Sequence, residues 1–483
     1  MFISGYNGFS TDIQAFRYLL IRHSQQTQFF CLLGIFLIHI NVTDRVDFDL
    51  CSYFSSGSNW LQPRPPSPFK MTSRERVLAA INHRQPDRIP IDFSAHRSSG
   101  IAALAYPKLR AHLGLEPKPV RVYDMVQQLA VVDEDVLDRF TVDTIEMGRG
   151  FLLEESDWKD WVLPDGSPCQ IPHYIHLEKR DDNWYLFTED GCELGVQKQG
   201  WLYFEQTYFP LRERDIADDD FSDLEDILNR TLWTGVPCPG GHLPLNQEGL
   251  AEMKDKAKAL RDSTEKAVVG LFGGNMFELP QWLYGMDNYF TALKLFPKDV
   301  LRLSEKLCAL HLKNLEKWLG AVGEFIDVIV FGDDLGGQNG LLISPEMYRR
   351  YFKPFHRQLW NRAKKLADVK VMLHCCGDVS SIIPDLIDAG LDALNPVQIS
   401  CPGMDPAWLK SHFGTKLTFW GGGCDTRFML PSSTQEDIQK HVKEQIKILG
   451  TDGGFVFQQV HNIMADVPID NVVAMFEAVT MSA

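Results

Sequence analysis

Short apolar runs alternate with longer amphipathic segments along most of this chain. A continuous apolar run of five to seven residues, rich in Val, Ile and Phe, predicts a buried strand, and apolar residues at helical spacing predict an amphipathic helix. Eight strands are expected on this basis, at residues 88–93, 143–147, 267–273, 327–332, 369–374, 393–398, 417–422 and 454–460. Strands that alternate with helices are typical of a parallel sheet. Eight such units predict an α/β fold, the (β/α)₈ TIM barrel.

The helical segments carry their own start signals. Several open with Pro or Ser near the first turn, where a missing amide hydrogen costs nothing or a side chain caps the helix. They are expected at residues 72–83, 297–320, 344–366, 380–390, 434–450 and 468–479. Thr72 is the expected N-cap of the first of them.

Two stretches depart from this rhythm. Residues 156–210 are rich in Trp, Tyr, Gly and Asp with local alternation, which predicts a β-hairpin insertion after the second strand and a lid over the barrel mouth. Residues 1–70 end in a Ser/Pro-rich linker, so we expect a poorly ordered extension or a start-site artefact there. The barrel domain is expected over residues 71–483. The apolar run at 28–42 is shorter than the roughly 20 residues that span a bilayer.

Composition narrows the class of partner. The net charge of -16 argues against nucleic acid and anionic lipid as ligands, so we expect a cytoplasmic enzyme that acts on small molecules. The ten cysteines are scattered rather than packed into a short domain. A disulfide framework is therefore not expected, and the thiols are free to bind metal. The oligomeric state stays open.

Polar and metal-binding side chains gather where the predicted strands end. In a parallel barrel the carboxyl ends of the strands carry the chemistry. The residues found near these positions are Asp143, Asn275, Asp333, Asp334, His374, Cys376, Gln398, Cys424 and His461, with Gln338 in the loop that follows Asp334.

Three of these residues form a zinc-type ligand set. His374 and Cys376 are one residue apart at the end of one predicted strand, and Cys424 follows another. One imidazole and two thiolates suit Zn²⁺, and three protein ligands leave a fourth position for water or substrate, as in catalytic zinc sites. Such a zinc binds a substrate thiol as thiolate. The alternative is a buried histidine with two packed cysteines. Cys375 is expected to point away, because side chains alternate along a strand.

The other candidates have structural alternatives. Asp333 and Asp334 are predicted to contact substrate or to supply a fourth zinc ligand, but both also fit a turn or a helix cap. Asn275, Gln338, Gln398 and His461 are predicted to contact substrate, although each also fits a structural hydrogen bond. The glycine-rich runs at 270–274 and 421–423 lack nucleotide-binding fingerprints.

The order of motifs resembles the uroporphyrinogen decarboxylase superfamily of (β/α)₈ barrels, over nearly all of residues 71–483. The resemblance depends on PDRIP, FGDDLGGQNGLLISPEMYRRYFKP, HCCGDVSSIIPDLIDAGLDALNPVQ, GMDPAWLKSHFG, FWGGGCDT and HNIMADVPIDNVVAMFEAV. The decarboxylase branch carries an Arg-rich carboxylate clamp after the first strand. Here that stretch is IDFSAHRSSG, in which only Arg97 remains.

The resemblance is greater to the zinc-dependent methylcobamide:thiol methyltransferases and the related corrinoid demethylation enzymes. His374, Cys376 and Cys424 match the zinc ligands of that branch. It implies methyl transfer between a corrinoid, carried by a small partner protein, and a thiol or another small donor or acceptor. Uroporphyrinogen decarboxylation, in tetrapyrrole biosynthesis, is the second hypothesis. A non-catalytic barrel that binds a tetrapyrrole, with zinc as a structural staple, is the third.

Overall fold

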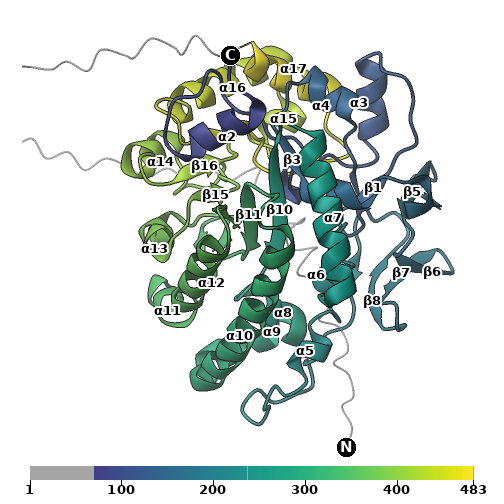
Figure 1. The fold of residues 1–483 in the computed structure, drawn as a ribbon, viewed down its shortest axis with the longest axis vertical. Coiled ribbons are helices and arrows are strands. Elements are labelled where there is room, and N and C mark those ends of the chain that lie inside the picture. The colour runs from purple at the N-terminus through teal and green to yellow at the C-terminus, as the bar shows by residue number, and fades with distance from the viewer. Residues whose placement is uncertain (1–69, 237, 482–483) are drawn as a thin grey trace, which may run out of the picture. The chain divides into compact units, whose positions relative to one another are not determined.

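Seven parallel strands form the central sheet. This computed structural model describes residues 70–236 and 238–481, and Figure 1 shows its fold. Their order across the sheet is β17, β16, β15, β14, β11, β10 and β3, so every neighbour in sequence is a neighbour in space. The strands are β3 (Thr144–Glu146), β10 (Ala267–Gly273), β11 (Val328–Gly332), β14 (Lys370–His374), β15 (Ala393–Asn395), β16 (Thr418–Trp420) and β17 (Phe455–Val456). All seven lie within predicted strands.

The eighth predicted strand, at residues 88–93, closes the sheet through a single residue. Ile91 forms a parallel bridge with Phe457 next to β17, and its carbonyl accepts from Asp143 N beside β3. Pro90 has no amide hydrogen, and Ile91 N donates to the Asp143 carboxylate instead of to a carbonyl of the sheet. These two features keep the segment from extending as a regular strand. The α/β barrel with eight strand positions is confirmed.

Helices cover the outside of this sheet (Figure 1). The longer ones are α2 (Ser73–Ile81), α7 (Gln247–Ser263), α10 (Pro297–Val322), α12 (Lys353–Leu366), α16 (Gln435–Leu449) and α17 (Ile469–Thr480). The shorter ones are α3 (Tyr106–His112), α4 (Glu134–Arg139), α5 (Leu224–Ile227), α6 (Leu232–Gly235), α8 (Glu278–Tyr284), α9 (Met286–Leu295), α11 (Pro345–Tyr351), α13 (Ile383–Ala389), α14 (Pro406–Phe413) and α15 (Met429–Ser432). The predicted cap of α2 is confirmed, because Thr72 Oγ1 accepts from Glu75 N at 3.2 Å.

One residue expected at the chemical face lies at the opposite end. Asp143 precedes β3, so it belongs to the amino-terminal edge of the sheet. It is fully buried and pairs with Arg76 and Arg88, each at 2.6 Å. The prediction that Asp143 sits among the strand ends of the mouth is wrong, because the strand starts after this residue and does not end there. Asp143 instead ties α2 and the closing segment to the base of the barrel.

The predicted insertion after the second strand consists of antiparallel hairpins, which lie at one side of the barrel (Figure 1). Their strands are β4 (Trp158–Val162), β5 (Pro168–Pro172), β6 (His176–Arg180), β7 (Asn183–Phe187), β8 (Glu193–Gln197) and β9 (Glu205–Gln206). A separate short pair, β1 (Val122–Asp124) and β2 (Leu129–Ala130), precedes β3, and β12 (Gly336–Gly337) pairs with β13 (Gly340–Leu341) after β11. The β-rich insertion is confirmed.

The core has two layers. A small inner cluster contains alternate residues of the strands, including Val269, Val330, Met372 and Val456, while residues between them face the larger cluster under the helices.

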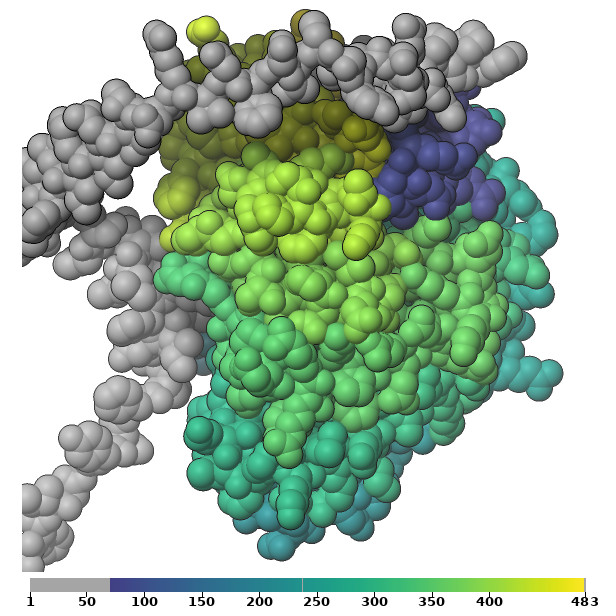
Figure 2. Space-filling model, turned by 90° about the vertical axis from the view of Figure 1, so that its left-hand side faces the viewer, coloured from purple at the N-terminus to yellow at the C-terminus, as the bar shows by residue number. Residues whose placement is uncertain are grey.

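Figure 2 shows the start of the described chain, in purple, beside residues of the C-terminal part. His83 Nδ1 lies 3.0 Å from Gly414 O at this contact. Among the described helices, none is long and apolar enough to cross a membrane.

Candidate metal centre

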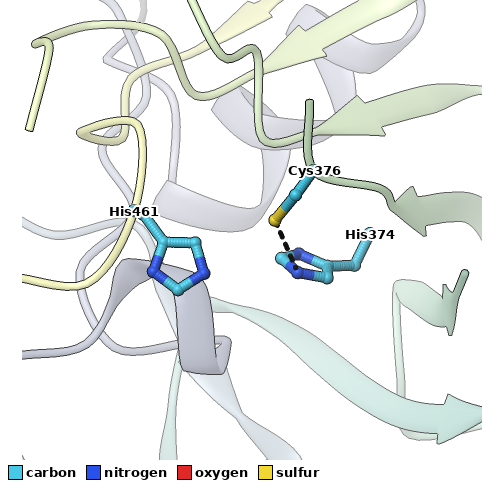
Figure 3. A group of neighbouring side chains, drawn as sticks. All are labelled: His374, Cys376 and His461. Carbon is cyan, nitrogen blue, oxygen red and sulfur yellow. Dashed lines mark hydrogen bonds between the residues drawn. The ribbon is translucent and has the colours of Figure 1, made fainter. Parts of the chain in front are cut away.

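Three side chains with metal-binding atoms meet at the carboxyl end of the sheet. The ligand atoms of His374, Cys376 and His461 all lie within 4.8 Å of one another, and each of the three side chains is partly exposed. His374 is the last residue of β14, Cys376 follows it in the next turn, and His461 follows β17 from across the barrel (Figure 3). The group therefore comes from two separate strand ends, as expected of a barrel active site.

The imidazole of His374 is held in one orientation. Its Nδ1 donates to Asn395 Oδ1 at 2.9 Å, because the Asn395 amide group donates in turn to Trp420 O and leaves its oxygen as the acceptor. The Nε2 atom of His374 therefore carries the lone pair. Cys376 Sγ lies 3.5 Å from it (Figure 3). A hydrogen bond that fixes the remote nitrogen of a histidine is the usual support for a metal ligand.

His461 has the same kind of support. Its Nδ1 lies 2.8 Å from Asn462 Oδ1, and the Asn462 amide donates to Gln127 Oε1 at 3.1 Å. With Nδ1 as the donor, Nε2 of His461 keeps its lone pair. Burial and the neighbouring His374 lower the pKa of His461, so the neutral form that binds metal is favoured. Sequence reasoning placed His461 among the substrate contacts; the structure brings it into the ligand group.

The thiol of Cys376 needs a cation to become a thiolate. Burial raises its pKa well above the ordinary value, and the nearby Asp334 carboxylate raises it further. Asp334 Oδ1 accepts from Cys376 N at 2.7 Å and lies 4.0 Å from His374 Nε2. A divalent cation between these atoms would offset the cost of the negative charge. Two neutral imidazoles and one thiol therefore fit a zinc ion.

Tight backbone packing holds the Cys376 turn in place. Gly377 has a φ of +88°, and a Cβ on it would lie 2.3 Å from Gly336 C. A Cβ on Gly336 would likewise lie 2.6 Å from Cys376 O. Only glycine fits at both positions, because two backbones pass each other in direct contact. The loop after β11 therefore fixes the position of the cysteine ligand.

The structure does not bring Cys424 into this group. Its side chain is fully buried in the larger core cluster, and its Sγ contacts Asp425 O at 3.8 Å. Its carbonyl accepts from Val460 N at 2.9 Å, so Cys424 and His461 leave neighbouring strands. Cys375 is also fully buried, as its predicted outward orientation requires.

The Asp333 carboxylate makes its hydrogen bonds to backbone amides and to a histidine of the fold. Its carboxylate is fully buried and accepts from the backbone amides of Met276, Phe277 and Glu278 at the start of α8, each at 2.9 to 3.0 Å. His356 Nε2 lies 2.8 Å from the same carboxylate. A carboxylate at a helix start stabilises the helix by satisfying its first amides. We therefore assign Asp333 a structural role.

The remaining predicted residues tie loops together. Gln398 Oε1 accepts from Gly377 N at 2.8 Å, and Gln398 Nε2 donates to Gln338 Oε1. Gln338 Nε2 donates to Ser400 O at 2.7 Å. Asn275 Nδ2 donates to Glu278 Oε2 at 2.9 Å. These residues lie around His374, Cys376 and His461, which we call the metal group, and are not part of it.

Sequence reasoning missed two residues beside the group. His96 packs its ring on that of His374, with the centroids 4.8 Å apart, and Asn395 holds His374 in orientation. Burial and the neighbouring His374 and Arg97 lower the pKa of His96 well below its ordinary value. His96 follows the predicted strand at 88–93 and Asn395 lies within the one at 393–398, but a lone His or an Asn before Pro gives no distinctive signal in one sequence.

The comparisons with known proteins agree with the fold and the motifs. The family model "Uroporphyrinogen decarboxylase (URO-D)" matches residues 243–481. A methylated-thiol--coenzyme M methyltransferase of Methanosarcina mazei is 30% identical over 112 residues, which are 23% of this chain and 27% of the relative. The match thus spans about a quarter of that relative's length.

A solved structure of a methyltransferase from Methanosarcina mazei supports the fold. It has a TM-score of 0.52 and 16% identity, and the match covers 85% of this chain and 98% of that one. The resemblance read from the motifs is confirmed. Residues 243–481 match the uroporphyrinogen decarboxylase family, and the relative and the solved structure that the chain resembles are both methyltransferases.

Proposed function

We propose that this chain is a zinc-dependent methyltransferase that moves a methyl group between a corrinoid and a small thiol or methyl donor. The observation that carries the proposal is the meeting of His374, Cys376 and His461 at the mouth of the barrel. The corrinoid would arrive on a partner protein. The partial match to a methyltransferase of methylated thiols supports the reaction class.

His374 and Cys376 are two of the three proposed zinc ligands. The third is His461, which the structure places in the group, or Cys424, which the motif resemblance implies. The remaining coordination position would accept the substrate sulfur. Bound zinc would lower the pKa of a substrate thiol and hold it as a thiolate for attack on a methyl group.

The residues around the zinc ligands set the geometry and the charge. Asn395 holds the proton on the remote nitrogen of His374, so the near nitrogen stays free to bind. His96 is buried against His374 and stays neutral, which avoids a second positive charge beside the metal. Asp334 fixes the Cys376 amide and adds a negative charge nearby. The β-hairpin insertion is proposed as the cover that excludes water.

The direct test is methyl transfer from methylcobalamin to small thiols, followed by the absorbance change as cob(I)alamin forms. The wild-type chain should react, and Cys376→Ser should lose at least a hundredfold in rate while remaining folded by circular dichroism. Cys401→Ser is the matched control, because this buried thiol lies outside the ligand group. Equal rates in Cys376→Ser and wild type would overturn the proposal.

Decarboxylation of a porphyrinogen has less support from the site. The one arginine after the first strand position, Arg97, lies 2.5 Å from Asp124 Oδ2, so its charge is already paired. A substrate with several carboxylates needs several free cations. Release of CO₂ from uroporphyrinogen by the purified chain would revive this second hypothesis.

A further inference from the structure

A second buried group of polar side chains borders the metal group. It consists of Tyr123, Glu146, Tyr174 and Cys238, which we call the Glu146 cluster. Glu146 is the last residue of β3 and therefore stands at the mouth of the barrel, Tyr123 belongs to β1, and Tyr174 comes from the insertion between β5 and β6. Burial raises the pKa of the Tyr174 hydroxyl, and Cys238 and Glu146 add to this shift, so the three groups interact across the cluster.

The segment after the first strand position connects this cluster to the metal group. His96 packs on His374, and Ser98 Oγ donates to Asn395 Oδ1, the atom that also accepts from His374. Arg97, between them in sequence, donates to Cys238 Sγ at 2.9 and 3.2 Å. Three consecutive residues thus contact both the metal group and the Glu146 cluster.

Two arginines, Arg149 and Arg97, act on the Glu146 carboxyl, and the charge of Arg97 is already paired. Arg97 Nε lies 2.5 Å from Asp124 Oδ2, and two of its nitrogens are directed at Cys238 Sγ. Its guanidinium also lies over the ring of Trp233, 5.5 Å from the centroid. Asp124 is 2% exposed and so cannot exchange its partner for water at low cost. Arg97 has little charge left for an anionic ligand.

Three groups of the cluster keep unused hydrogen-bonding capacity. Within the described part of the chain, no hydrogen bond or ion pair reaches the Glu146 carboxyl, although the residue is only 6% exposed. The hydroxyls of Tyr123 and Tyr174 are buried and likewise have no partner among residues 70–236 and 238–481. Buried polar groups without partners are costly, and they mark places where a ligand supplies the missing bonds.

The charges select the chemistry of that ligand. Three carboxyls, Glu146, Asp124 and Asp92, act here against two guanidiniums, those of Arg149 and Arg97. An added anion would therefore meet net repulsion, while a cation would complete the balance. A carboxylate and two hydroxyls accept hydrogen bonds, and a ligand with several N–H donors satisfies all three. A carboxylate or sulfonate offers no donor to Glu146.

We propose that the Glu146 cluster binds the non-reacting end of the small substrate, and that this end is a protonated amine. This inference rests on the proposed function only for the position of the reacting end at the metal group. Glu146 forms the ion pair with the ammonium, and the hydroxyls of Tyr123 and Tyr174 accept its remaining N–H groups. A substrate with an anionic tail is disfavoured.

The test uses three methyl thioethers that differ only at the far end: 2-(methylthio)ethylamine, 2-(methylthio)ethanol and 3-(methylthio)propionate. Binding of each to the full chain is measured by isothermal titration at pH 8, without turnover. The amine should bind at least tenfold more tightly than the propionate. Glu146→Gln should weaken the amine at least tenfold and leave the alcohol within twofold. Tyr123→Phe should weaken the amine less, and Glu305→Gln, an exposed carboxylate of α10, should change nothing.

The outcomes separate this inference from the proposed function. A preference for the amine that disappears in Glu146→Gln supports amine binding at the Glu146 cluster, even where no methyl transfer is detected. The proposed function stands without amine binding at the Glu146 cluster in either of two cases. In the first, a chain that transfers methyl groups binds the propionate best. In the second, its affinity for the amine is unchanged in both Glu146→Gln and Tyr123→Phe.

Discussion

At the scale of single residues, Glu146 makes the stability of the fold depend on pH. Burial raises its pKa from 4.5 to about 7, so the folded chain holds a proton that the unfolded chain has released. Between pH 4.5 and 7 the folded state binds more protons, and stability therefore falls as the pH rises. The lost stability is complete above pH 7 and amounts to ~3 kcal/mol.

Glu146→Gln removes this penalty. The variant should match wild type near pH 4.5 and exceed it in free energy of unfolding by ~2 to 3 kcal/mol at pH 8. Urea denaturation over this pH range measures the difference, with Glu305→Gln as the control. A constant difference between the two chains at every pH would show that Glu146 is already ionised in the fold.

The site was only partly predictable from single residues. His374 and Cys376 stood out because two soft ligands follow one strand, and both lie in the metal group. His461 was recognised as a mouth residue, but its place in the group depends on the distance between two strand ends. That distance is set by the closed barrel and by packing, which a linear pattern does not contain. Asp333 was ambiguous in the sequence for the same reason, since the start of α8 that it caps is 55 residues away.

At the scale of elements, the loops after β11 and β14 act together. Gly377→Ala would place a methyl group 2.3 Å from Gly336 C and force a residue with a Cβ to adopt a φ of +88°. We expect a loss of at least ~2 kcal/mol in the free energy of unfolding, and a weaker metal site because Cys376 shifts with the turn. Thermal unfolding and zinc affinity measured against a chelator report the two effects.

A matched control separates conformation from crowding. Gly166 has a similar φ of +84°, but nothing lies within 4 Å of a Cβ added there. Gly166→Ala should cost only the backbone term, about 1 kcal/mol, and leave zinc affinity unchanged. Equal losses in the two variants would mean that the contact between Gly377 and Gly336 is relaxed at little cost.

At the scale of the whole molecule, the barrel was predictable because its pattern is repeated. Each strand was a continuous apolar run followed by an amphipathic helix, and β3 to β17 appear in sequence order across the sheet. The segment at 88–93 was less regular than predicted. Its closing contacts depend on Asp143, whose carboxylate accepts a hydrogen bond from the amide of Ile91. Residues 1–69 lie outside the described residues, so the predictions for that extension stay predictions.

A catalytic zinc in this barrel would be detected first in the metal content of the protein. The chain purified without chelators should contain about one zinc, as measured by mass spectrometry, and His374→Ala and Cys376→Ser should contain almost none. Comparison of His461→Asn with Cys424→Ser then identifies the third ligand: loss of zinc in the first supports the group in the structure, and loss in the second supports the ligand set of the resembling family. A wild-type chain without zinc, even after incubation with the metal, would contradict the account.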